Sequence, residues 1–271
     1  MFARRLSGRR WQTRLVIPIS DPTDPRLDGY RGLRGKESRE VLWAEGITVV
    51  ERLLDSGLPI TSLLVSTKAV DRLMYLVERT DAPVLVVPPD VITEVLGFVL
   101  QRGIVAMAPR PPLAELDDVI RDATRLVVLE GLNDAENLGA IARSARGLGA
   151  DGLVLDATCA DPYYRRSVRV SMGEMLHLPI ARVELTEALE RLAAAGWAIW
   201  ALTPRRDAAA ITSRPGPARV ALVVGAEGPG LSDRVLAAYT NVRIPMRSDV
   251  DSLNVGHALA AALAIVQSST A

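Results

Sequence analysis

Polar residues and glycines gather at three points in the C-terminal half of the chain, each where an apolar strand pattern ends. The three segments read N-L-G-A-I-A-R (residues 137–143), L-V-V-G-A-E-G-P-G-L (222–231) and I-P-M-R-S-D-V-D-S-L-N (244–254). Because burying an unpaired polar group costs free energy, polar side chains at the edge of an otherwise apolar half-chain rarely serve the fold alone. We therefore expect the three segments to form one shared site.

The glycine-rich loop at residues 225–230 lies between a strand pattern and a helix pattern. Its glycines allow a ligand to approach the backbone closely. The loop has no lysine to hold a phosphate, and the carboxylate of Glu227 would repel one. These features favour a ligand that lacks phosphates and can carry a positive charge. Taken alone, the loop is explained equally well as a turn with capping residues.

The other two segments also have a simple structural explanation. Asn137 and Ser252 are of the residue types that cap helix N-termini, and Arg143 lies one turn beyond Gly139 on a nearby helix face. A capped helix with a surface arginine would account for the first segment alone, and capping by Ser252 would account for the third. All three segments in this order, each at a strand end, favour a functional site instead.

A G-x-G-x-x-G pattern at Gly147, Gly149 and Gly152 matches the dinucleotide-binding fingerprint but stands in the wrong context. That fingerprint follows a strand and opens a helix, so that the helix N-terminus meets a pyrophosphate. Here the glycines end a helix pattern and lead into a strand, which is a common way to close a helix. We expect no nucleotide at this point.

The elements that must position these segments alternate regularly after residue 125. Strands are predicted at 126–130, 152–156, 180–183, 197–202, 220–224 and 242–245, and helices at 138–148, 165–175, 187–194, 232–239 and 253–267. Apolar strands that alternate with helices indicate a parallel sheet covered on both faces. Ligands of such sheets bind beyond the carboxyl ends of the strands, where the three segments lie.

The first half of the chain predicts a smaller α/β domain. Helices are predicted at 38–54, 71–78 and 90–97, and strands at 63–66, 83–87 and 103–108. The proline-rich stretch 109–118 breaks regular structure, because proline removes a backbone donor and fixes φ. We therefore predict a basic tail at 1–20, a first domain at 21–108, a linker at 109–118 and a second domain at 119–271.

Composition sets broad limits on the function. The 271 residues contain 32 basic and 32 acidic side chains, but residues 1–14 hold five arginines and no acid, which indicates either a disordered tail or an arm for a polyanion. Cys159 is the only cysteine, so an internal disulfide is excluded. We find no signal-peptide pattern and expect a cytoplasmic protein. His177 and His257 have no partners at metal-ligand spacing, and we expect no metal.

Taken together, the three segments resemble motifs 1, 2 and 3 of the SpoU (TrmH) branch of the SPOUT RNA 2′-O-ribose methyltransferases. The stretch D-P-Y-Y-R-R-S-V-R-V-S-M-G at residues 161–173, running on to Leu178 and Pro179, resembles another part of that branch. The resemblance covers roughly residues 125–267. The N-terminal half is similar to the RNA substrate-binding domain of these enzymes, with A-E-G (44–46) and Q-R-G-I-V-A (101–106) as landmarks. That domain is itself similar to small RNA-binding ribosomal proteins.

The resemblance implies an α/β fold whose parallel-sheet SPOUT domain holds a trefoil knot, one of the rare exceptions to unknotted topology. It implies S-adenosylmethionine as the cofactor, bound bent within the knot, and a homodimer with the site near the interface. The implied reaction is 2′-O-methylation of a ribose in structured RNA. We expect 23S ribosomal RNA first, because the extra N-terminal domain suits a structured target, and transfer RNA second.

The family's functional polar positions fall on five residues of this chain, namely Asn137, Arg143, Glu227, Ser252 and Asn254. Its backbone contacts to the cofactor fall on Gly225, Ile244 and Leu253, with Thr203 as a further candidate. The chain departs from the family after S-L-N-V, where serine, a small apolar residue and alanine are usual and Gly256, His257 and Ala258 stand here. We expect this change to alter packing rather than to abolish activity.

In the family that the chain resembles, the arginine of the first segment is often given the role of base. A guanidinium, with a pKa above about 12, hardly loses its proton. We therefore expect Arg143 to orient a neighbouring phosphate and to stabilise the developing alkoxide. We expect Glu227 to hold the site and its loop, and Ser252 and Asn254 to arrange the knot and the substrate end.

Arg165, Arg166 and Arg169 form a basic run next to Tyr163 and Tyr164. The run is either a solvated helix face or an RNA contact in which arginines meet phosphates and rings stack on bases. We retain the second interpretation as a prediction of RNA-binding residues.

Two other functions fit parts of the sequence. One is a catalytically silent RNA-binding protein with the same fold, against which the intact polar residues of all three segments argue. The other is an unrelated doubly wound enzyme that binds a phosphate-bearing nucleotide at residues 225–230. The missing lysine and the presence of Glu227 argue against it.

Overall fold

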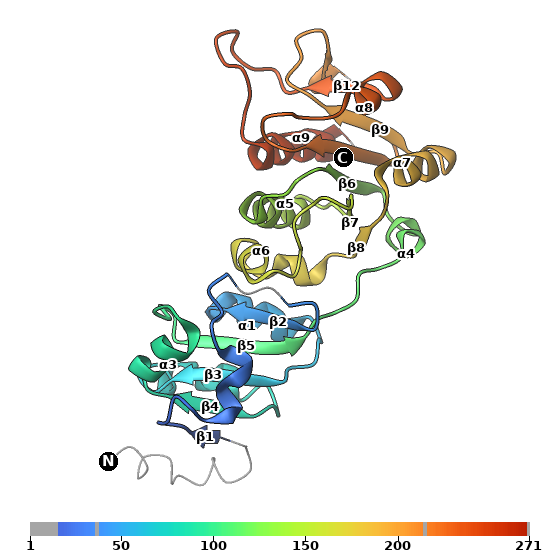
Figure 1. Cartoon of the computed structure of the whole chain (residues 1–271). Coiled ribbons are helices and arrows are strands. Elements are labelled where there is room, and N and C mark those ends of the chain that lie inside the picture. The colour runs from blue at the N-terminus through green and yellow to red at the C-terminus, as the bar shows by residue number, and fades with distance from the viewer. Residues whose placement is uncertain (1–15, 36–37, 214–215, 270–271) are drawn as a thin grey trace. The chain divides into compact units, whose positions relative to one another are not determined.

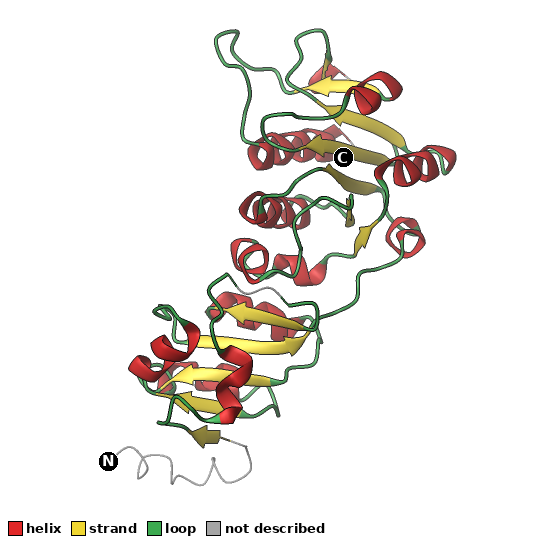
Figure 2. Cartoon of the chain, viewed as in Figure 1, coloured by secondary structure: helices red, strands yellow, loops and turns green. Residues whose placement is uncertain are grey.

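The computed structural model describes residues 16–35, 38–213 and 216–269. Contacts divide the chain into two compact units. The N-terminal unit consists of Met1–Pro111 with Tyr163–Leu176, and the C-terminal unit consists of Pro112–Pro162 with His177–Ala271. Figure 1 labels the elements of both units, and Figure 2 distinguishes helices, strands and loops. The five arginines of the predicted basic tail lie outside the described residues.

The N-terminal unit is built on a mixed five-stranded sheet in the order β1-β4-β3-β5-β2. Its strands are β1 (Val16–Pro18), β2 (Val41–Glu45), β3 (Ser62–Ser66), β4 (Val84–Val87) and β5 (Ile104–Pro109). β1, β4 and β3 are parallel, whereas β5 runs antiparallel to both β3 and β2. Its helical segments are η2 (Pro25–Tyr30), α1 (Ile47–Asp55), η3 (Asp71–Leu73), α2 (Met74–Val77), α3 (Pro89–Leu96) and α6 (Arg165–Val170).

Two predictions for the start of this unit are wrong. The sequence predicts one helix over residues 38–54, but β2 and α1 share that stretch and meet at Gly46, whose φ is +100°. Pairing of β2 with β5 decides this, because a five-residue strand is stabilised by a distant partner that local periodicity does not reveal. Residues 16–18, predicted as part of the tail, form β1 beside β4.

The C-terminal unit has a seven-stranded sheet in which every pair of neighbours is parallel, as the sequence predicted. The order is β10-β12-β9-β11-β6-β7-β8. The strands are β6 (Arg125–Glu130), β7 (Gly152–Leu155), β8 (Ile180–Arg182), β9 (Ala198–Leu202), β10 (Ala209–Ala210), β11 (Val220–Gly225) and β12 (Thr240–Arg243). The helical segments are α4 (Leu116–Ile120), α5 (Ala135–Gly147), α7 (Leu185–Ala194), η5 (Ile211–Ser213), α8 (Asp233–Ala238) and α9 (Val255–Ser269), and η4 (Glu174–His177) spans the boundary between the units.

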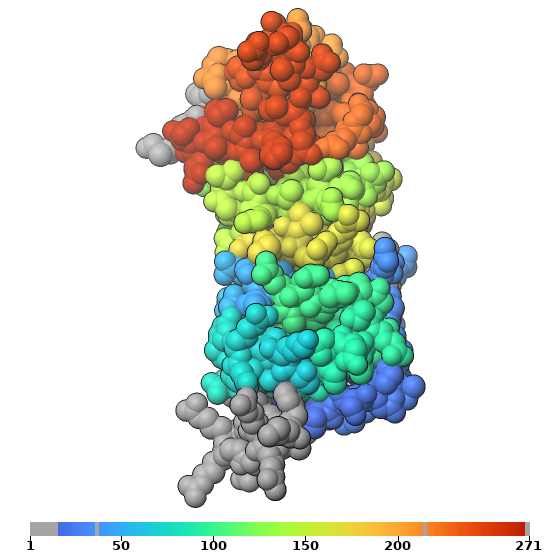
Figure 3. All heavy atoms as spheres, turned by 90° about the vertical axis from the view of Figure 1, so that its left-hand side faces the viewer, coloured from blue at the N-terminus to red at the C-terminus, as the bar shows by residue number. Residues whose placement is uncertain are grey.

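Helices cover both faces of this sheet. Leu116, Leu189 and Val235, from α4, α7 and α8, share one apolar cluster with strand residues such as Val128 and Val223. α5 and α9 pack against each other, and Figures 1 and 3 show them side by side. α5 also contacts β7, and α9 contacts β11. The parallel strands therefore end at one common edge, between helix layers that fix its loops.

Two further predictions need correction. α4 begins at Leu116, inside the stretch predicted as a linker without structure. The single helix predicted over 165–175 ends at Val170, and η4 follows. Between them Met172 and Gly173 have φ values of +55° and +83°, a left-handed conformation that an α-helix does not continue through. Among the described residues, no helix is long and apolar enough to cross a membrane.

Candidate functional site

A cavity of about 680 Å³ lies at the carboxyl ends of β9, β11 and β12 in the C-terminal unit. This volume is typical of small-molecule and cofactor sites. Loops line most of it: the wall comprises residues 202–205, 224–231, Asp233, Leu236, Ile244, Met246, 252–255 and Ala258. The second and third polar segments therefore face one cavity.

The loop after β11 is shaped by glycine. A side chain on Gly225 would place its Cβ 2.1 Å from the carbonyl oxygen of Gly230, so no other residue fits there without moving the backbone. Gly228 and Gly230 have φ values of +90° and +70°, and Gly230 N–H donates to the carbonyl of Ala226 at 3.0 Å. After the loop, Ser232 N–H donates to Glu130 Oε2 at 2.9 Å. Both ends of the loop are thus held by the strands β11 and β6.

Asn254 connects the three polar segments. Its Nδ2 donates to Asn137 Oδ1 at 2.9 Å and to Glu227 Oε1 at 2.5 Å. Its Oδ1 accepts from the backbone N–H groups of Gly256 at 3.0 Å and His257 at 3.3 Å, which makes Asn254 the N-cap of α9. One side-chain amide therefore ties residue 137, the glycine loop and the start of α9 together.

The capping roles predicted from the sequence are wrong. Asp134 is the N-cap of α5, and its Oδ1 accepts from Asn137 N–H at 2.7 Å. Asn137 itself stands inside the first turn, which leaves its side chain for Asn254. Ser252 precedes α9 without capping it, because Asn254 takes that place. The sequence signal for this cap is the residue type of Asp134, since aspartate is among the preferred N-cap residues.

The residues predicted to meet a cofactor all line the cavity: Thr203, Gly225, Ile244 and Leu253, together with Ser252. Thr203 is one of the few buried polar residues of the described chain, and its Oγ1 accepts from Arg205 N–H at 3.4 Å. Leu253 is 43% exposed.

The charges on the cavity wall favour a cation over a phosphate. The guanidinium of Arg205 makes two hydrogen bonds to Asp207, at 3.2 and 3.0 Å, so its charge is already compensated. Glu227 and Asp233 add two carboxylates to the wall. The cavity thus combines backbone groups, apolar surface and acids, which suits a ligand with cationic centres and no phosphate.

The family model of the SpoU rRNA Methylase family matches residues 124–264, more than half of the chain. The chain belongs to the SpoU rRNA methylase family. As a member of this family it is an RNA methyltransferase, and the matched residues include all three polar segments.

Several relatives match over nearly the full chain. A Mycobacterium tuberculosis protein named an uncharacterised tRNA/rRNA methyltransferase is 40% identical over 264 residues, which are 93% of this chain and 91% of the relative. The 23S rRNA (adenosine(1067)-2′-O)-methyltransferase of Streptomyces azureus is 29% identical over 252 residues, 90% of this chain and 93% of its own. The crystal structure of an AdoMet-bound rRNA methyltransferase from Sinorhizobium meliloti gives a TM-score of 0.79 at 25% identity, covering 94% and 98% of the two chains.

In this SpoU family member, Arg143 lies apart from the Asn254 network. It is exposed on α5, and its side chain makes no hydrogen bond or ion pair within the described residues. Arg143 lies six positions after Asn137 on the helix, which turns it by roughly 120° around the helix axis. Arg143 is thus the one predicted catalytic residue that the structure shows neither on the cavity wall nor in the network.

The predicted RNA-binding run splits into two kinds of arginine. Arg165 forms an ion pair with Glu45 and lies 4.7 Å from the centroid of the Phe98 ring, and its side chain is only 14% exposed. It stabilises the packing of α6 within the N-terminal unit, which does not agree with the prediction of Arg165 as an RNA contact. Arg166 and Arg169 are exposed.

Cys159 and the acidic groups of the C-terminal unit show no sign of a second reactive centre. Burial, followed by the charge of Asp156, raises the pKa of the Cys159 thiol to about 12, so the thiol stays protonated and unreactive near neutrality. No group of three or more His, Cys, Asp or Glu side chains among the described residues has the geometry of a metal site.

Proposed function

We propose that this protein transfers a methyl group from S-adenosylmethionine to the 2′-hydroxyl of a ribose in structured RNA, with 23S ribosomal RNA as the first substrate. The observation that carries the proposal is the hydrogen-bonded group of Asn137, Glu227 and Asn254 beside the cavity. The Streptomyces azureus relative, a 23S rRNA 2′-O-methyltransferase, supports the choice of substrate and of acceptor atom.

The methyl donor of the family is S-adenosylmethionine, and the cavity fits it. Backbone groups of Gly225, Ile244 and Leu253 would hold the donor, and the buried side chain of Thr203 would contribute a hydroxyl. The carboxylates of Glu227 and Asp233 match its positive charges, and it has no phosphate for them to repel. When bound, it supplies an electrophilic methyl group on a sulfonium centre.

Asn254 acts as a positioning residue in this proposal. Both protons of its amide and its carbonyl oxygen are used inside the protein, so the side chain has little capacity left for a substrate. It fixes where the glycine loop, α5 and α9 stand relative to one another. Since methyl transfer depends on an in-line approach of the acceptor oxygen, this fixation contributes to the rate.

Arg143 acts electrostatically. Its guanidinium carries a positive charge, and within the described residues it has no carboxylate partner. It is thus able to bind a phosphate next to the reacting ribose and to stabilise negative charge that develops on the 2′-oxygen. We assign the exposed Arg166 and Arg169 to contacts with the RNA backbone on the same grounds of charge and exposure.

The family resemblance extends the proposal to a trefoil knot in the C-terminal unit, to a homodimer and to a cytoplasmic enzyme. The absence of Arg143 from the cavity wall of a single chain agrees with a site that is completed by a second copy.

The test is a methylation assay with S-adenosylmethionine labelled in its methyl group, offered separately with deproteinised 23S rRNA and with total transfer RNA. A ribose methylated at its 2′-oxygen protects the adjoining phosphodiester bond from alkali, so the product is identified by alkaline hydrolysis. Label in transfer RNA alone would replace the proposed substrate. Label in a base would refute 2′-O-transfer, and donor binding without transfer to any RNA would favour the silent RNA-binding protein.

A further inference from the structure

Glu130 ends β6, and its side chain reaches the far end of the glycine loop (residues 225–230) that follows the neighbouring strand β11. In the register of the sheet Glu130 stands opposite Gly225, where the loop begins. Its Oε2 accepts a hydrogen bond of 2.9 Å from the backbone N–H of Ser232, the N-cap of α8. One residue at the edge of the sheet therefore stands beside the entry of the loop and holds its exit.

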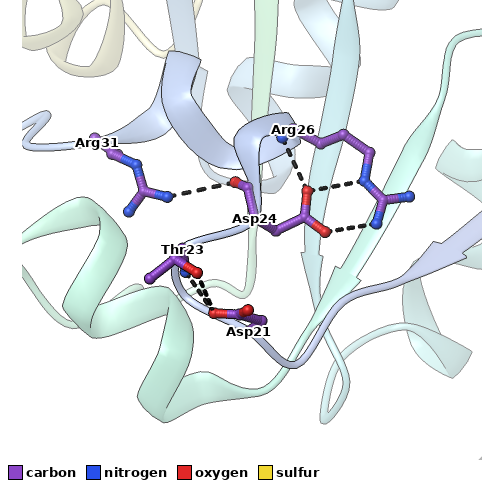
Figure 4. Close-up of polar contacts among 5 residues, drawn as sticks. All are labelled: Asp21, Thr23, Asp24, Arg26 and Arg31. Carbon is purple, nitrogen blue, oxygen red and sulfur yellow. Dashed lines mark hydrogen bonds and ion pairs between the residues drawn. The ribbon is translucent and has the colours of Figure 1, made fainter.

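The contact between Glu130 and Ser232 joins distant parts of the chain. Figure 4 shows two carboxylates whose backbone contacts are local: Asp21 accepts from Thr23 N–H, and Asp24 accepts from Arg26 N–H. Each of those contacts spans two residues and shapes a single turn. The contact from Glu130 spans 102 residues, so it fixes two separate segments relative to each other.

Glu130 acts from outside the cavity proposed for S-adenosylmethionine. It is not among the residues that line that cavity, and instead lines a second cavity of about 380 Å³, with residues of α7 and α8. Ser232 lines the second cavity too, whereas Leu231 and Asp233, on either side of it, line the first. A carboxylate on one side of the Ser232 backbone thus fixes two residues that face the cofactor cavity on the other.

The end of β6 is itself held in place. Gly131, the next residue, has a φ of +65° and donates its N–H to Asp156 Oδ2 at 2.6 Å. The other carboxylate oxygen of Asp156 accepts from the N–H groups of Thr158 and Cys159, at 2.8 and 2.9 Å. The turn that carries Glu130 is therefore anchored at the end of β7, so its carboxylate reaches the loop from a fixed point.

The glycine loop needs such a support because its backbone is permissive. Gly228 and Gly230 occupy the left-handed region, and glycine exchanges readily between that region and the others. A flexible loop loses conformational entropy when it closes on a ligand, whereas a loop that is already fixed in its bound shape loses less. A fixed exit therefore favours binding without any direct contact to the ligand.

We propose that Glu130 is a positioning residue for the methyl donor, because its carboxylate fixes the exit of the glycine loop and thereby raises the affinity for S-adenosylmethionine. The inference rests on the cofactor cavity of the proposed function, and it adds a residue that lies in none of the three polar segments. The role requires an acceptor oxygen that reaches Ser232 N–H, so side-chain length should matter more than negative charge.

The experiment measures the dissociation constant of S-adenosylmethionine by calorimetric titration of the full chain. Glu130→Ala should weaken binding by about tenfold, or about 1.4 kcal/mol, close to the effect of one hydrogen bond to a charged group. Glu130→Gln keeps the length and an acceptor oxygen, so its affinity should lie within about threefold of wild type. Glu130→Asp keeps the charge but is one methylene shorter, so it should bind as weakly as Glu130→Ala.

Glu184 offers a matched control, because it makes the same kind of contact away from the cofactor. Its Oε2 accepts from Glu187 N–H at 2.9 Å at the start of α7, and it lines the same second cavity as Glu130. No residue of α7 is among those that line the cofactor cavity. Glu184→Ala should lower the resistance to urea about as much as Glu130→Ala does, while its affinity for S-adenosylmethionine stays within about twofold of wild type.

The rate of RNA methylation gives a readout that a purely structural role would not move. Because the contact acts on binding, Glu130→Ala should raise KM for S-adenosylmethionine and keep kcat within about twofold. A lower kcat at unchanged affinity would refute the proposal, and so would rescue of affinity by Glu130→Asp but not by Glu130→Gln. Equal affinity loss in Glu130→Ala and Glu184→Ala would show a general effect of stability and refute it as well.

The titrations also separate this proposal from the proposed function. If wild type and Glu130→Ala bind S-adenosylmethionine equally well, Glu130 does not position the loop, although the proposed function stands. If the wild-type protein binds the donor but methylates no RNA, the proposed function fails, and the titrations of the Glu130 variants still decide on the positioning role. If the wild-type protein does not bind S-adenosylmethionine, both proposals are refuted.

Discussion

Asn254 donates a hydrogen bond of 2.5 Å to Glu227, and the same side chain caps α9. The first contact needs an N–H donor and the second needs an acceptor oxygen. An amide offers both, whereas a carboxylate offers only acceptors at neutral pH. The geometry therefore requires asparagine at this position and not its closest acidic analogue.

Replacement Asn254→Asp should separate the two roles. Aspartate caps helices as well as asparagine does, so α9 should remain folded. The hydrogen bonds to Asn137 and Glu227 are lost, and two carboxylates then face each other, so we expect methylation to slow by about tenfold to a hundredfold. The repulsion raises the carboxyl pKa of the pair, so activity should partly recover as the pH is lowered and a shared proton restores a donor.

The measurement is the initial rate of methyl transfer as a function of pH, from about 5 to about 8. This range extends from just above the usual carboxyl pKa to above the usual histidine pKa. Glu184→Ala is the control, because it removes the cap of α7 without touching the cavity. A rate for Asn254→Asp equal to that of the control would show that the Asn254 network does not serve catalysis.

Arg143 should matter for the rate and not for stability. Its side chain is exposed without a partner in the described residues, so Arg143→Ala should leave the free energy of unfolding within about 0.5 kcal/mol. Loss of an electrostatic contact to the transition state should lower kcat by about 100-fold, and Arg143→Lys should keep part of the rate because it keeps the charge. Arg146→Ala, another exposed arginine of α5, is the control. Full activity of Arg143→Ala would remove this residue from the mechanism.

The glycine loop predicts a sharp contrast between two Gly→Ala changes. In Gly225→Ala the new Cβ would lie 2.1 Å from a backbone oxygen, so the loop must move and we expect S-adenosylmethionine binding to be lost. In Gly147→Ala the new Cβ meets nothing within 4 Å, and alanine favours a helix by up to about 1 kcal/mol over glycine. Calorimetric titration of the cofactor and thermal unfolding measure both effects. Normal cofactor binding by Gly225→Ala would contradict the assigned role of this loop.

Asp156 should make the C-terminal unit sensitive to acid. Partial burial raises the pKa of its carboxyl, but hydrogen bonds from Thr158 and from Gly131 N–H outweigh that effect and hold the pKa below its ordinary value. A depressed pKa stabilises the fold above the ordinary carboxyl pKa, and this contribution is lost as the pH falls through the folded-state value.

Asp156→Asn should therefore lower the free energy of unfolding by about 1 to 3 kcal/mol at neutral pH. The difference from wild type should shrink as the pH falls below the ordinary carboxyl pKa of about 4. Urea unfolding at several pH values measures this. A difference that does not vary with pH would mean that the carboxylate charge plays no part.

The parallel sheet was predictable because its strands are continuous apolar runs separated by helices, and a parallel sheet between two helix layers buries both faces of such strands. The convergence of residues 137, 227 and 254 followed the same logic, since each segment ends a strand of that sheet. β2 was not predictable from local pattern, because its strand conformation depends on β5, more than fifty residues away.

Roles of single side chains were harder to predict than their location. Asn137, Ser252 and Asn254 are all residue types that cap helices, and only three-dimensional geometry shows that Asn254 caps α9 while Asp134 caps α5. Likewise, Arg165 and Arg169 are both arginines and lie in the same short stretch of the sequence. The ion pair to Glu45 distinguishes them, and it depends on a residue 120 positions earlier.

The chain enters the N-terminal unit a second time, since Tyr163–Leu176 belongs to it while the residues on either side belong to the C-terminal unit. Neither unit is thus encoded as one uninterrupted stretch. A chimera made by exchanging only the first 111 residues with a relative would leave α6 of this chain packed against the N-terminal sheet of another protein. Transfer of the N-terminal unit to another protein therefore requires both stretches of the chain, residues 16–35 with 38–111 and residues 163–176 among the described ones.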